Sequence, residues 1–346
     1  MRGGIVLQSG LSRVFPKTLP GSGGSFYYFS RLPGEQKLLY EAIYSGIRSY
    51  SNEIEMPMKP INEISEIFSC VLLDNPMIFY TASSFELSTD SHSQRCDFIP
   101  KYKFSHSQAK EYAKKIMRCL RVFDSAQNKS DIYKELYVHD FCVNNFSYDY
   151  SFSDNSYSIL GLVLNKSAVC AGIAKFVKLA FDYLQIKSLV VSGKANSPRP
   201  NSGEEGHAWN IVRVGGRTYH LDVTFDMTIK DKITRYDYFN LPDDEIKKDH
   251  AITGKVPPCT TAGKDYYSVK SLYVNGMGEL DDFIGRALKQ GKRHIVVKIK
   301  NEPYTKDSAS QVIETAKRQY SKNFTSGAAI ETSCNSSQMV FEIIFK

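Results

Sequence analysis

The sequence predicts an α+β fold whose core is a cysteine-bearing helix packed on an antiparallel sheet. Residues 167–193, SAVCAGIAKFVKLAFDYLQIKSLVVSG, join a helical spacing of apolar side chains to a valine-rich run typical of a buried strand. Residues 206–226, GHAWNIVRVGGRTYHLDVTFD, contain two β-like runs around a Gly-Gly pair, which signals a tight hairpin. An N-terminal α+β region and a small C-terminal α/β unit are expected to flank this core.

The chain has 346 residues, a formal net charge of +7 and the composition of a globular protein. This length accommodates about two or three subdomains with a sizeable core. The basic residues form no run, so we do not expect a nucleic acid partner. The seven cysteines contain no CxxC pair, which argues against a disulfide framework and a structural zinc site, and we expect no cofactor.

We expect four parts along the chain. They are a flexible tail, an N-terminal α+β region, the core and the C-terminal α/β unit, at residues 1–24, 25–104, 105–262 and 263–346. No apolar run approaches the ~20 residues of a transmembrane helix, and the first apolar stretch is too short for a secretory signal. We therefore expect no membrane segment and, by default, a cytoplasmic location, with export left open. The oligomeric state is not predicted.

The first elements follow from apolar spacing and turn residues. Residues 34–49 predict a helix, and residues 67–87 predict the end of a helix, a DNP turn and a strand. The stretch DFIPKYKF, residues 97–104, predicts a further strand. Ser105 and Gln108 form a capping-box signature, so we expect the next helix to begin there.

Two helices that follow carry candidate functional side chains. Ser130 is expected to cap a helix whose apolar stripe includes His139, which we expect to be buried and structural. Cys170 stands at the head of the next helix, where unpaired backbone N–H groups and the helix dipole favour a nucleophilic thiolate. The alternative is that Cys170 is a small buried hydrophobe, as most free cysteines are. The apolar face of this helix is expected to comprise Ile173, Phe176, Val177, Ala180 and Leu184.

The hairpin register follows from placing Gly215 and Gly216 in the turn. Trp209 then faces Asp222, and alternation places both on one face of the hairpin with His207. We expect this face to be polar and the opposite face to be the apolar one that joins the core. His207 and Asp222 become diagonal neighbours, about 7–8 Å apart along the backbone and within reach of each other's side chains.

These positions predict a nucleophilic site. Asp222 can accept a hydrogen bond from one nitrogen of His207 and fix its tautomer, while the other nitrogen takes the proton of Cys170. One alternative is that His207 is a packed, structural side chain. Another is zinc binding by Cys170 and His207 with His220 or Asp222, although their spacing matches no common zinc pattern.

The remaining candidates have weaker signals. Trp209, Asn210 and His139 are expected to bind substrate or to support the site. The polar segment 193–206 is expected to be a surface loop, with a movable flap as the alternative. The C-terminal unit shows no chemistry; its expected elements are helices at residues 280–291 and 309–320 and the strands HIVVKIK and QMVFEIIF.

Three motifs give the chain a resemblance to a known family. AVCAG (168–172), GHAWNIV (206–212) and YHLDVTFD (219–226) resemble the transglutaminase-like superfamily of papain-like cysteine enzymes, particularly its bacterial core-domain proteins. The chain departs from the family pattern at Ala171, where a polar residue is usual, and at Phe225, which replaces a tryptophan. Similar stretches elsewhere are YVHDFCVNNFSYD (137–149), YDYFNLPDDEIKKDH (236–250) and DNPMIFY (74–80).

The resemblance implies a function as well as a papain-like, transglutaminase-like core. Cys170 would be the nucleophile, His207 the base and Asp222 its orienter. The implied activity is acyl transfer or amide hydrolysis through a thioester on Cys170, by a protease, deamidase or transglutaminase acting on protein or peptide amides. No calcium site is implied. The alternative is a non-catalytic module that keeps the fold and binds peptides or the cell envelope.

Overall fold

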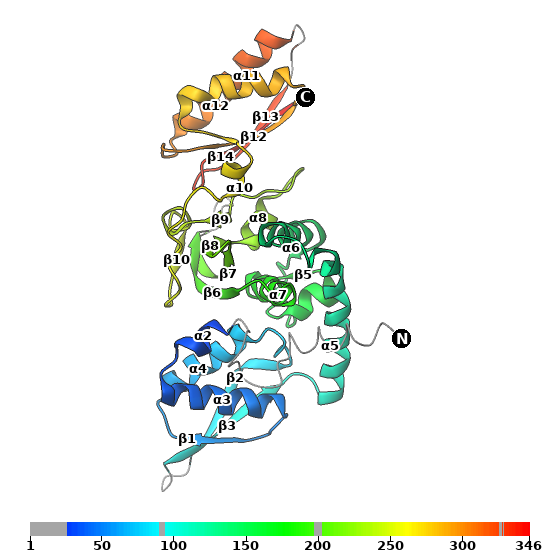
Figure 1. Ribbon diagram of the computed structural model, residues 1–346, viewed down its shortest axis with the longest axis vertical. Coiled ribbons are helices and arrows are strands. Elements are labelled where there is room, and N and C mark those ends of the chain that lie inside the picture. Colours follow the sequence, from blue (N-terminus) through cyan, green and yellow to red (C-terminus); the bar gives the residue numbers. More distant parts are fainter. Residues whose placement is uncertain (1–25, 90–93, 197–202, 325–326, 328) are drawn as a thin grey trace.

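The computed structural model describes residues 26–89, 94–196, 203–324, 327 and 329–346. The predicted tail at residues 1–24 lies outside these ranges. The molecule is elongated, with the N-terminal region at one end, the cysteine-bearing helix in the middle and the C-terminal unit at the other end (Figure 1). Helices and largely antiparallel sheets occur in each part, which confirms the α+β class.

The N-terminal region packs three helices against a small antiparallel sheet in the order β1-β3-β2. The expected helix at residues 34–49 and the strand within residues 97–104 are both confirmed. The elements are α2 (Tyr27–Arg31), α3 (Gly34–Arg48), β1 (Ile54–Pro57), α4 (Ile61–Asp74), β2 (Thr81–Thr89) and β3 (Arg95–Tyr102).

Two further helices connect this region to the core. The helix α5 (His106–Leu120) begins with the expected capping box, in which Ser105 and Gln108 each bond to the other's backbone N–H. A 3-10 helix (Arg121–Ala126) leads to α6 (Asp131–Asn145), which contributes buried side chains to the same hydrophobic core as α5.

The central sheet has five antiparallel strands in the order β10-β6-β7-β8-β9. The helix α7 (Cys170–Tyr183) packs on β6 and β7, as expected, and its predicted apolar face is buried. Figure 1 shows α6, α7 and α8 on one side of the sheet. The elements are β6 (Ser188–Asn196), β7 (Glu204–Val214), β8 (Arg217–Leu221), α8 (Val223–Ile229), β9 (Phe239–Leu241), α9 (Asp243–Ile246) and β10 (His250–Ile252).

The hairpin register is confirmed, but the second strand is shorter than expected. Val214 pairs with Arg217, and the ladder continues to Asn210 and Leu221. The expected strand through residues 222–226 is wrong, because α8 begins there. The reason is local: the side chain of Asp222 accepts from the backbone N–H of Phe225 and caps this helix, which outweighs the strand preference of the β-branched and aromatic residues after it.

The expectation of one polar hairpin face is also wrong, since both faces are buried. Trp209 and Ile211 pack with neighbours from β6 and with Cys259, which covers the second face. Alternation predicts a half-exposed sheet, whereas a sheet covered on both sides buries polar side chains that have partners. In the segment expected to be a loop, at 193–206, the described residues are mostly strand, because β6 and β7 extend to the pair Asn196 and Glu204. Residues 197–202 lie outside the described residues.

The C-terminal unit has a four-stranded sheet in the order β11-β12-β14-β13, antiparallel except for the β11–β12 pair. The predicted helices and strands are confirmed. The strand β13 was not predicted, because most of its side chains are polar and only half-buried or exposed. The elements are α10 (Tyr266–Val269), β11 (Tyr273–Val274), a 3-10 helix (Met277–Glu279), α11 (Leu280–Lys289), β12 (His294–Ile299), α12 (Lys306–Asn323), β13 (Ile330–Asn335) and β14 (Val340–Phe345).

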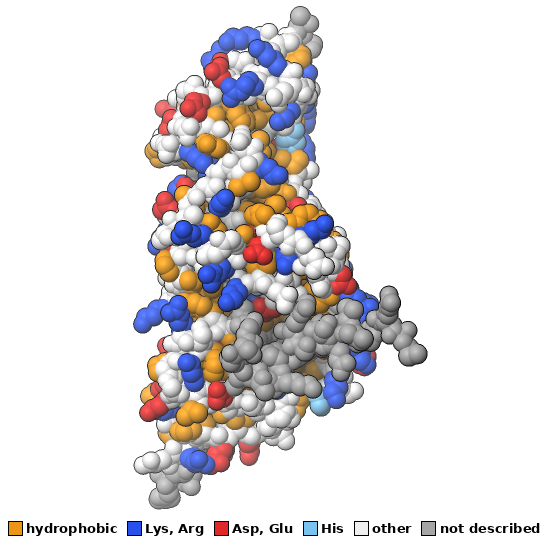
Figure 2. Space-filling model, viewed as in Figure 1, with side chains coloured by type: hydrophobic (Ala, Val, Ile, Leu, Met, Phe, Trp, Pro, Cys, Tyr) orange, Lys and Arg blue, Asp and Glu red, His pale blue; other side chains and the backbone are white. Residues whose placement is uncertain are grey.

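The hydropathy of the helices and the distribution of surface charge bear on possible membrane and nucleic acid contacts. Within the described residues, no helix combines the length and the hydropathy that crossing a membrane requires. On the face drawn in Figure 2, lysine and arginine side chains are dispersed among acidic and apolar ones. The net charge of +7 is therefore not gathered into a strip on this face.

Candidate active site

Cys170 is the first residue of α7 and is half-buried. It follows the short strand β5 (Ser167–Ala168), which pairs in parallel with β4 (Ser147–Tyr148). Val169, at the N-cap, has no side chain that could accept from the first turn. The backbone N–H of Cys170 is thus one of the helix N–H groups that lack an intrahelical acceptor.

Gly172 sets the position of the cysteine against the preceding loop. A Cβ atom at Gly172 would lie 2.2 Å from the carbonyl oxygen of Ser156 and 2.8 Å from that of Ser158. The loop itself is tied by Asp149, which accepts from the backbone N–H and hydroxyl groups of Ser151 and Ser153. The absence of a side chain at Gly172 therefore lets the start of α7 rest directly on a fixed loop.

His207 and Asp222 form a close, buried pair. His207 Nε2 donates to Asp222 Oδ2 at 2.7 Å, and Asp222 is fully buried. The other oxygen of Asp222 accepts from the backbone N–H of Phe225 at 3.0 Å. Burial opposes the charge of Asp222, but the facing imidazoles of His207 and His250 hold the pKa of this carboxyl well below its usual range.

The charge state of His207 follows from its partners. Burial opposes protonation, but the Asp222 carboxylate and the Cys170 thiol outweigh it and raise the pKa of His207 to about 10. The interaction with Cys170 places that thiol beside the imidazole, and Asp222 occupies Nε2. The structure therefore brings Cys170, His207 and Asp222 together, with Nδ1 of His207 left for the thiol.

His250 is a site residue that the sequence did not reveal. It lies on β10, with Nε2 3.0 Å from Asp222 Oδ2 and Nδ1 2.6 Å from Asp249 Oδ1. Its position depends on the pairing of β10 with β6, where His250 faces Ala195. The Asp249-His250 pair was visible in the sequence, but nothing local indicated this long-range strand pairing. Phe225 packs against both imidazoles, with ring centroids 4.6 Å from His207 and 4.7 Å from His250.

Trp209 and Asn210 lie behind the site. Both are 1% exposed. The indole N–H of Trp209 donates to His220 Nδ1 at 3.0 Å, so it is not free to bind a substrate oxygen. The amide of Asn210 donates to the carbonyl oxygen of Ala174 at 2.9 Å and so links β7 to α7. These contacts fix β7, which carries His207, against α7, which begins at Cys170.

His139 is fully buried one layer further back, on α6. Its Nε2 lies 3.0 Å from Asp226 Oδ2, and Tyr236 stacks on the ring. Asp226 is one helical turn after Asp222 in α8. His139 therefore contacts the helix whose first turn is capped by Asp222.

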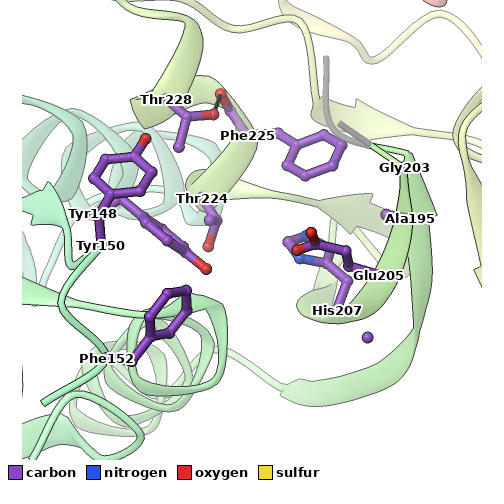
Figure 3. A pocket seen from close by; sticks show the side chains of 11 residues that line it. Tyr148, Tyr150, Phe152, Ala195, Gly203, Glu205, His207, Thr224, Phe225 and Thr228 are labelled. Carbon is purple, nitrogen blue, oxygen red and sulfur yellow. Dashed lines mark hydrogen bonds between the residues drawn. The ribbon is translucent and has the colours of Figure 1, made fainter. Parts of the chain in front are cut away.

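A cleft of about 220 Å³ opens beside His207. Figure 3 shows the side chains of Tyr148, Tyr150 and Phe152 on one side and those of His207 and Glu205 on the other. Tyr148 pairs with Ala168, two residues before Cys170, so this aromatic wall adjoins the start of α7. Burial and the charges of Cys170 and Glu205 raise the pKa of the Tyr148 hydroxyl. Tyr150 and Phe152 are exposed at its rim.

Two groups of side chains in the described part of the chain have the donor atoms of a metal site. The first is His207, Asp222 and His250; the second is His220, Asp243 and Cys259. The zinc alternative that joined Cys170 to His220 does not fit this arrangement, because His220 bonds to Trp209 and to Asp243 in the second group. In both groups the histidine nitrogen that faces a carboxylate donates a hydrogen bond to it, so these nitrogens offer no lone pair to a metal ion and neither group is assigned as a metal site.

Residues 120–223 match the sequence profile of the transglutaminase-like superfamily, and this segment includes Cys170, His207 and Asp222. No curated protein matches the chain. A structure described as a candidate cysteine protease from Cytophaga hutchinsonii is 14% identical, with a TM-score of 0.27, over 41% of this chain and 61% of that one. A structure described as a TGase is 13% identical, with a TM-score of 0.31, over 53% of each chain. This chain thus spans less than two thirds of either structure.

Proposed function

We propose, from the transglutaminase-like sequence of residues 120–223, that the chain is a cysteine-dependent enzyme acting on amides of proteins or peptides. One observation carries the proposal. The thiol at the head of α7 lies beside an imidazole whose far nitrogen bonds to a buried carboxylate at 2.7 Å. Nucleophile, base and orienter are then in the order that covalent acyl transfer requires.

The first half of the reaction forms a thioester. The Cys170 thiolate attacks the amide carbonyl carbon, and the backbone N–H of Cys170 donates to the developing oxyanion. The His207 imidazolium then gives its proton to the amide nitrogen, the C–N bond breaks, and an amine or ammonia leaves. Asp222 keeps the imidazole in the orientation that presents Nδ1 to the reaction.

The second half resolves the thioester. Neutral His207 takes a proton from the acceptor, whose oxygen or nitrogen attacks the thioester carbon, and the C–S bond breaks to regenerate the thiolate. Water as acceptor makes the enzyme a protease or deamidase, and an amine makes it a transglutaminase. The cleft favours a peptide carrying an apolar or aromatic side chain next to the reacting amide, because three aromatic rings form one of its walls.

One assay with three readouts tests the proposal. The full chain is incubated with dimethylated casein in the presence and absence of a fluorescent primary amine. Amine incorporation identifies a transglutaminase, ammonia release in the absence of the amine identifies a deamidase, and new amino termini identify a protease. We expect one of these activities, and we expect Cys170→Ala to abolish it while Cys119→Ala, a half-buried cysteine on α5, retains it.

The same pair of variants separates catalysis from binding. If Cys170→Ala and the wild type bind the casein equally well and neither turns it over, the catalytic proposal fails. The chain would then be a binding module that keeps the fold. An activity that persists in Cys170→Ala would also contradict the thioester.

A further inference from the structure

The hydrogen bonds of His250 define its charge. Its two ring nitrogens face two carboxylates, Asp222 at 3.0 Å and Asp249 at 2.6 Å. An ionised carboxylate can only accept, so both ring nitrogens must donate, and only the imidazolium carries a proton on each. The outer oxygen of Asp249 accepts from the hydroxyl of Tyr238 at 2.7 Å, which keeps that carboxylate in the role of an acceptor.

We infer that His250 is a positioning residue: a buried imidazolium that shares the Asp222 carboxylate with His207 and so allows His207 to release its proton. The consequence of this arrangement for the reaction rests on the proposed function. The charge state of His250 does not depend on that function and can be measured separately.

The surroundings of His250 favour its positively charged form. Burial opposes the charge, but Asp222 and Asp249 outweigh it and raise the pKa of His250. Burial, aided by the charge of His250, lowers the pKa of His220. The His220 ring is neutral because its Nδ1 accepts from the indole N–H of Trp209 at 3.0 Å. The titratable groups that face His250 from the elements around it are Asp222, Asp249, His207, His220 and Tyr238.

The shared carboxylate matters most in the second half of the reaction. In the thioester the thiolate charge is gone, and His207 must lose its proton to act as a base. If Asp222 were hydrogen-bonded to His207 alone, its negative charge would stabilise the protonated form of His207. His250, with its ring centroid 5.4 Å from that of His207, opposes the negative charge of Asp222. Its removal should therefore raise the pKa of His207.

Nitrogen NMR of the histidine rings tests the charge directly. In the full-length, ¹⁵N-histidine-labelled protein we expect both ring nitrogens of His250 to stay protonated from about pH 5 to 8. A single protonated nitrogen, or a nitrogen shifted by added zinc, would overturn the inference. This measurement needs no substrate and no folded variant of His250.

A matched pair of variants tests the effect on His207. In the Cys170→Ala background, which lacks the thiolate as the thioester does, His250→Asn is expected to raise the pKa of His207 by about one unit. His220→Asn is the control, because it removes a buried, neutral histidine of the same sheet and should leave that pKa unchanged. Equal pKa values of His207 in the two variants would contradict the role of His250. If His250→Asn does not fold, His250→Gln takes its place in the comparison.

The reaction gives the second readout. With Cys170 present, His250→Asn should move the acidic limb of the pH–rate profile of thioester hydrolysis to higher pH. The shift should equal the rise in the pKa of His207. A purely structural loss would lower the rate at every pH without moving the limb, and would refute the inference. A shifted pKa of His207 in a protein that turns over no amide would instead refute the proposed function and leave the charge of His250 standing.

Discussion

At the scale of single residues, the Asp222 carboxylate has three hydrogen-bonding partners within the described part of the chain, and it has two tasks. One oxygen accepts from His207 and His250, and the other caps α8 through the backbone N–H of Phe225. The same side chain thus orients the His207 imidazole and ends the strand β8. A substitution that keeps the cap but loses the charge can separate these tasks.

Asp222→Asn is such a substitution, since asparagine is as good an N-cap as aspartate. We expect the fold to persist and the rate of amide turnover to fall by about 10²–10⁴-fold, because a neutral amide no longer fixes the tautomer of His207. Steady-state kinetics and circular dichroism measure the two effects. Asp243→Asn, which changes the carboxylate beside His220, is the control, and an equal loss of activity there would contradict the assignment.

His139 predicts a pH dependence of stability. Burial opposes its charge, but Asp140 and Asp226 outweigh it and raise the pKa of His139 to about 9. A raised pKa stabilises the folded state fully below the unfolded value of about 6.5. That stabilisation is lost as the pH rises towards 9. The free energies of unfolding of wild type and His139→Gln, measured in urea, should therefore converge as the pH rises from about 6 to 10. A difference between the two free energies that stays constant over this range would contradict the prediction.

At the scale of elements, the position of α7 depends on the close approach at Gly172. The helix start rests on the carbonyl groups of Ser156 and Ser158, which leave no room for a Cβ atom. The hydrogen bond from Asn210 to Ala174 fixes the helix against β7. Any displacement of this helix moves Cys170 relative to His207.

Gly172→Ala should therefore reduce both stability and reactivity. We expect a loss of about 1–3 kcal/mol in the free energy of unfolding from overpacking, measured by urea denaturation, together with slower alkylation of Cys170. Gly254→Ala is the matched control, because a Cβ atom there meets nothing within 4 Å. Equal stability of the two variants would show that the loop carrying Ser156 and Ser158 can move to accommodate a Cβ atom at position 172. The close approach at Gly172 would then not determine the position of α7.

Local signals were sufficient for most elements and for part of the site. The capping box at Ser105, the Gly215-Gly216 turn and the apolar face of α7 each depend on residues close in sequence. The cap at Asp222 was hidden by strand-forming neighbours. His250 could not be found, because the pairing of β10 with β6 joins residues more than fifty positions apart, a contact that local periodicity does not encode.

At the scale of the whole molecule, the C-terminal unit is joined to the core by buried polar contacts. Arg235 pairs with Asp237 and with Glu342 of β14, and all three side chains are almost fully buried. Gln338 donates to the carbonyl oxygen of Glu245 at 3.2 Å, in the segment that leads to β10. The C-terminal unit thus packs against the part of the chain that carries His250.

Arg235→Met should weaken this junction strongly. It removes the guanidinium that Asp237 and Glu342 share, while Tyr267 still donates to Asp237 and His294 still contacts Glu342. We expect this loss to cost about 3–5 kcal/mol in the free energy of unfolding. Arg318→Met is the control, since Arg318 pairs with Asp281 at the surface and its loss should change little. Calorimetry of the full chain measures both, and similar unfolding temperatures for the two variants would contradict the role of the junction.

The measurement that tests the central claim most directly is the alkylation rate of Cys170 by iodoacetamide from about pH 5 to 8, in wild type and His207→Ala. Burial raises the pKa of each of the other six thiols, which serve as internal controls in the peptide mass spectra. We predict fast labelling of Cys170 alone near pH 6, and slower labelling in His207→Ala. Labelling of Cys170 no faster than that of the other cysteines, and unchanged in His207→Ala, would contradict the assignment of a histidine-activated nucleophile.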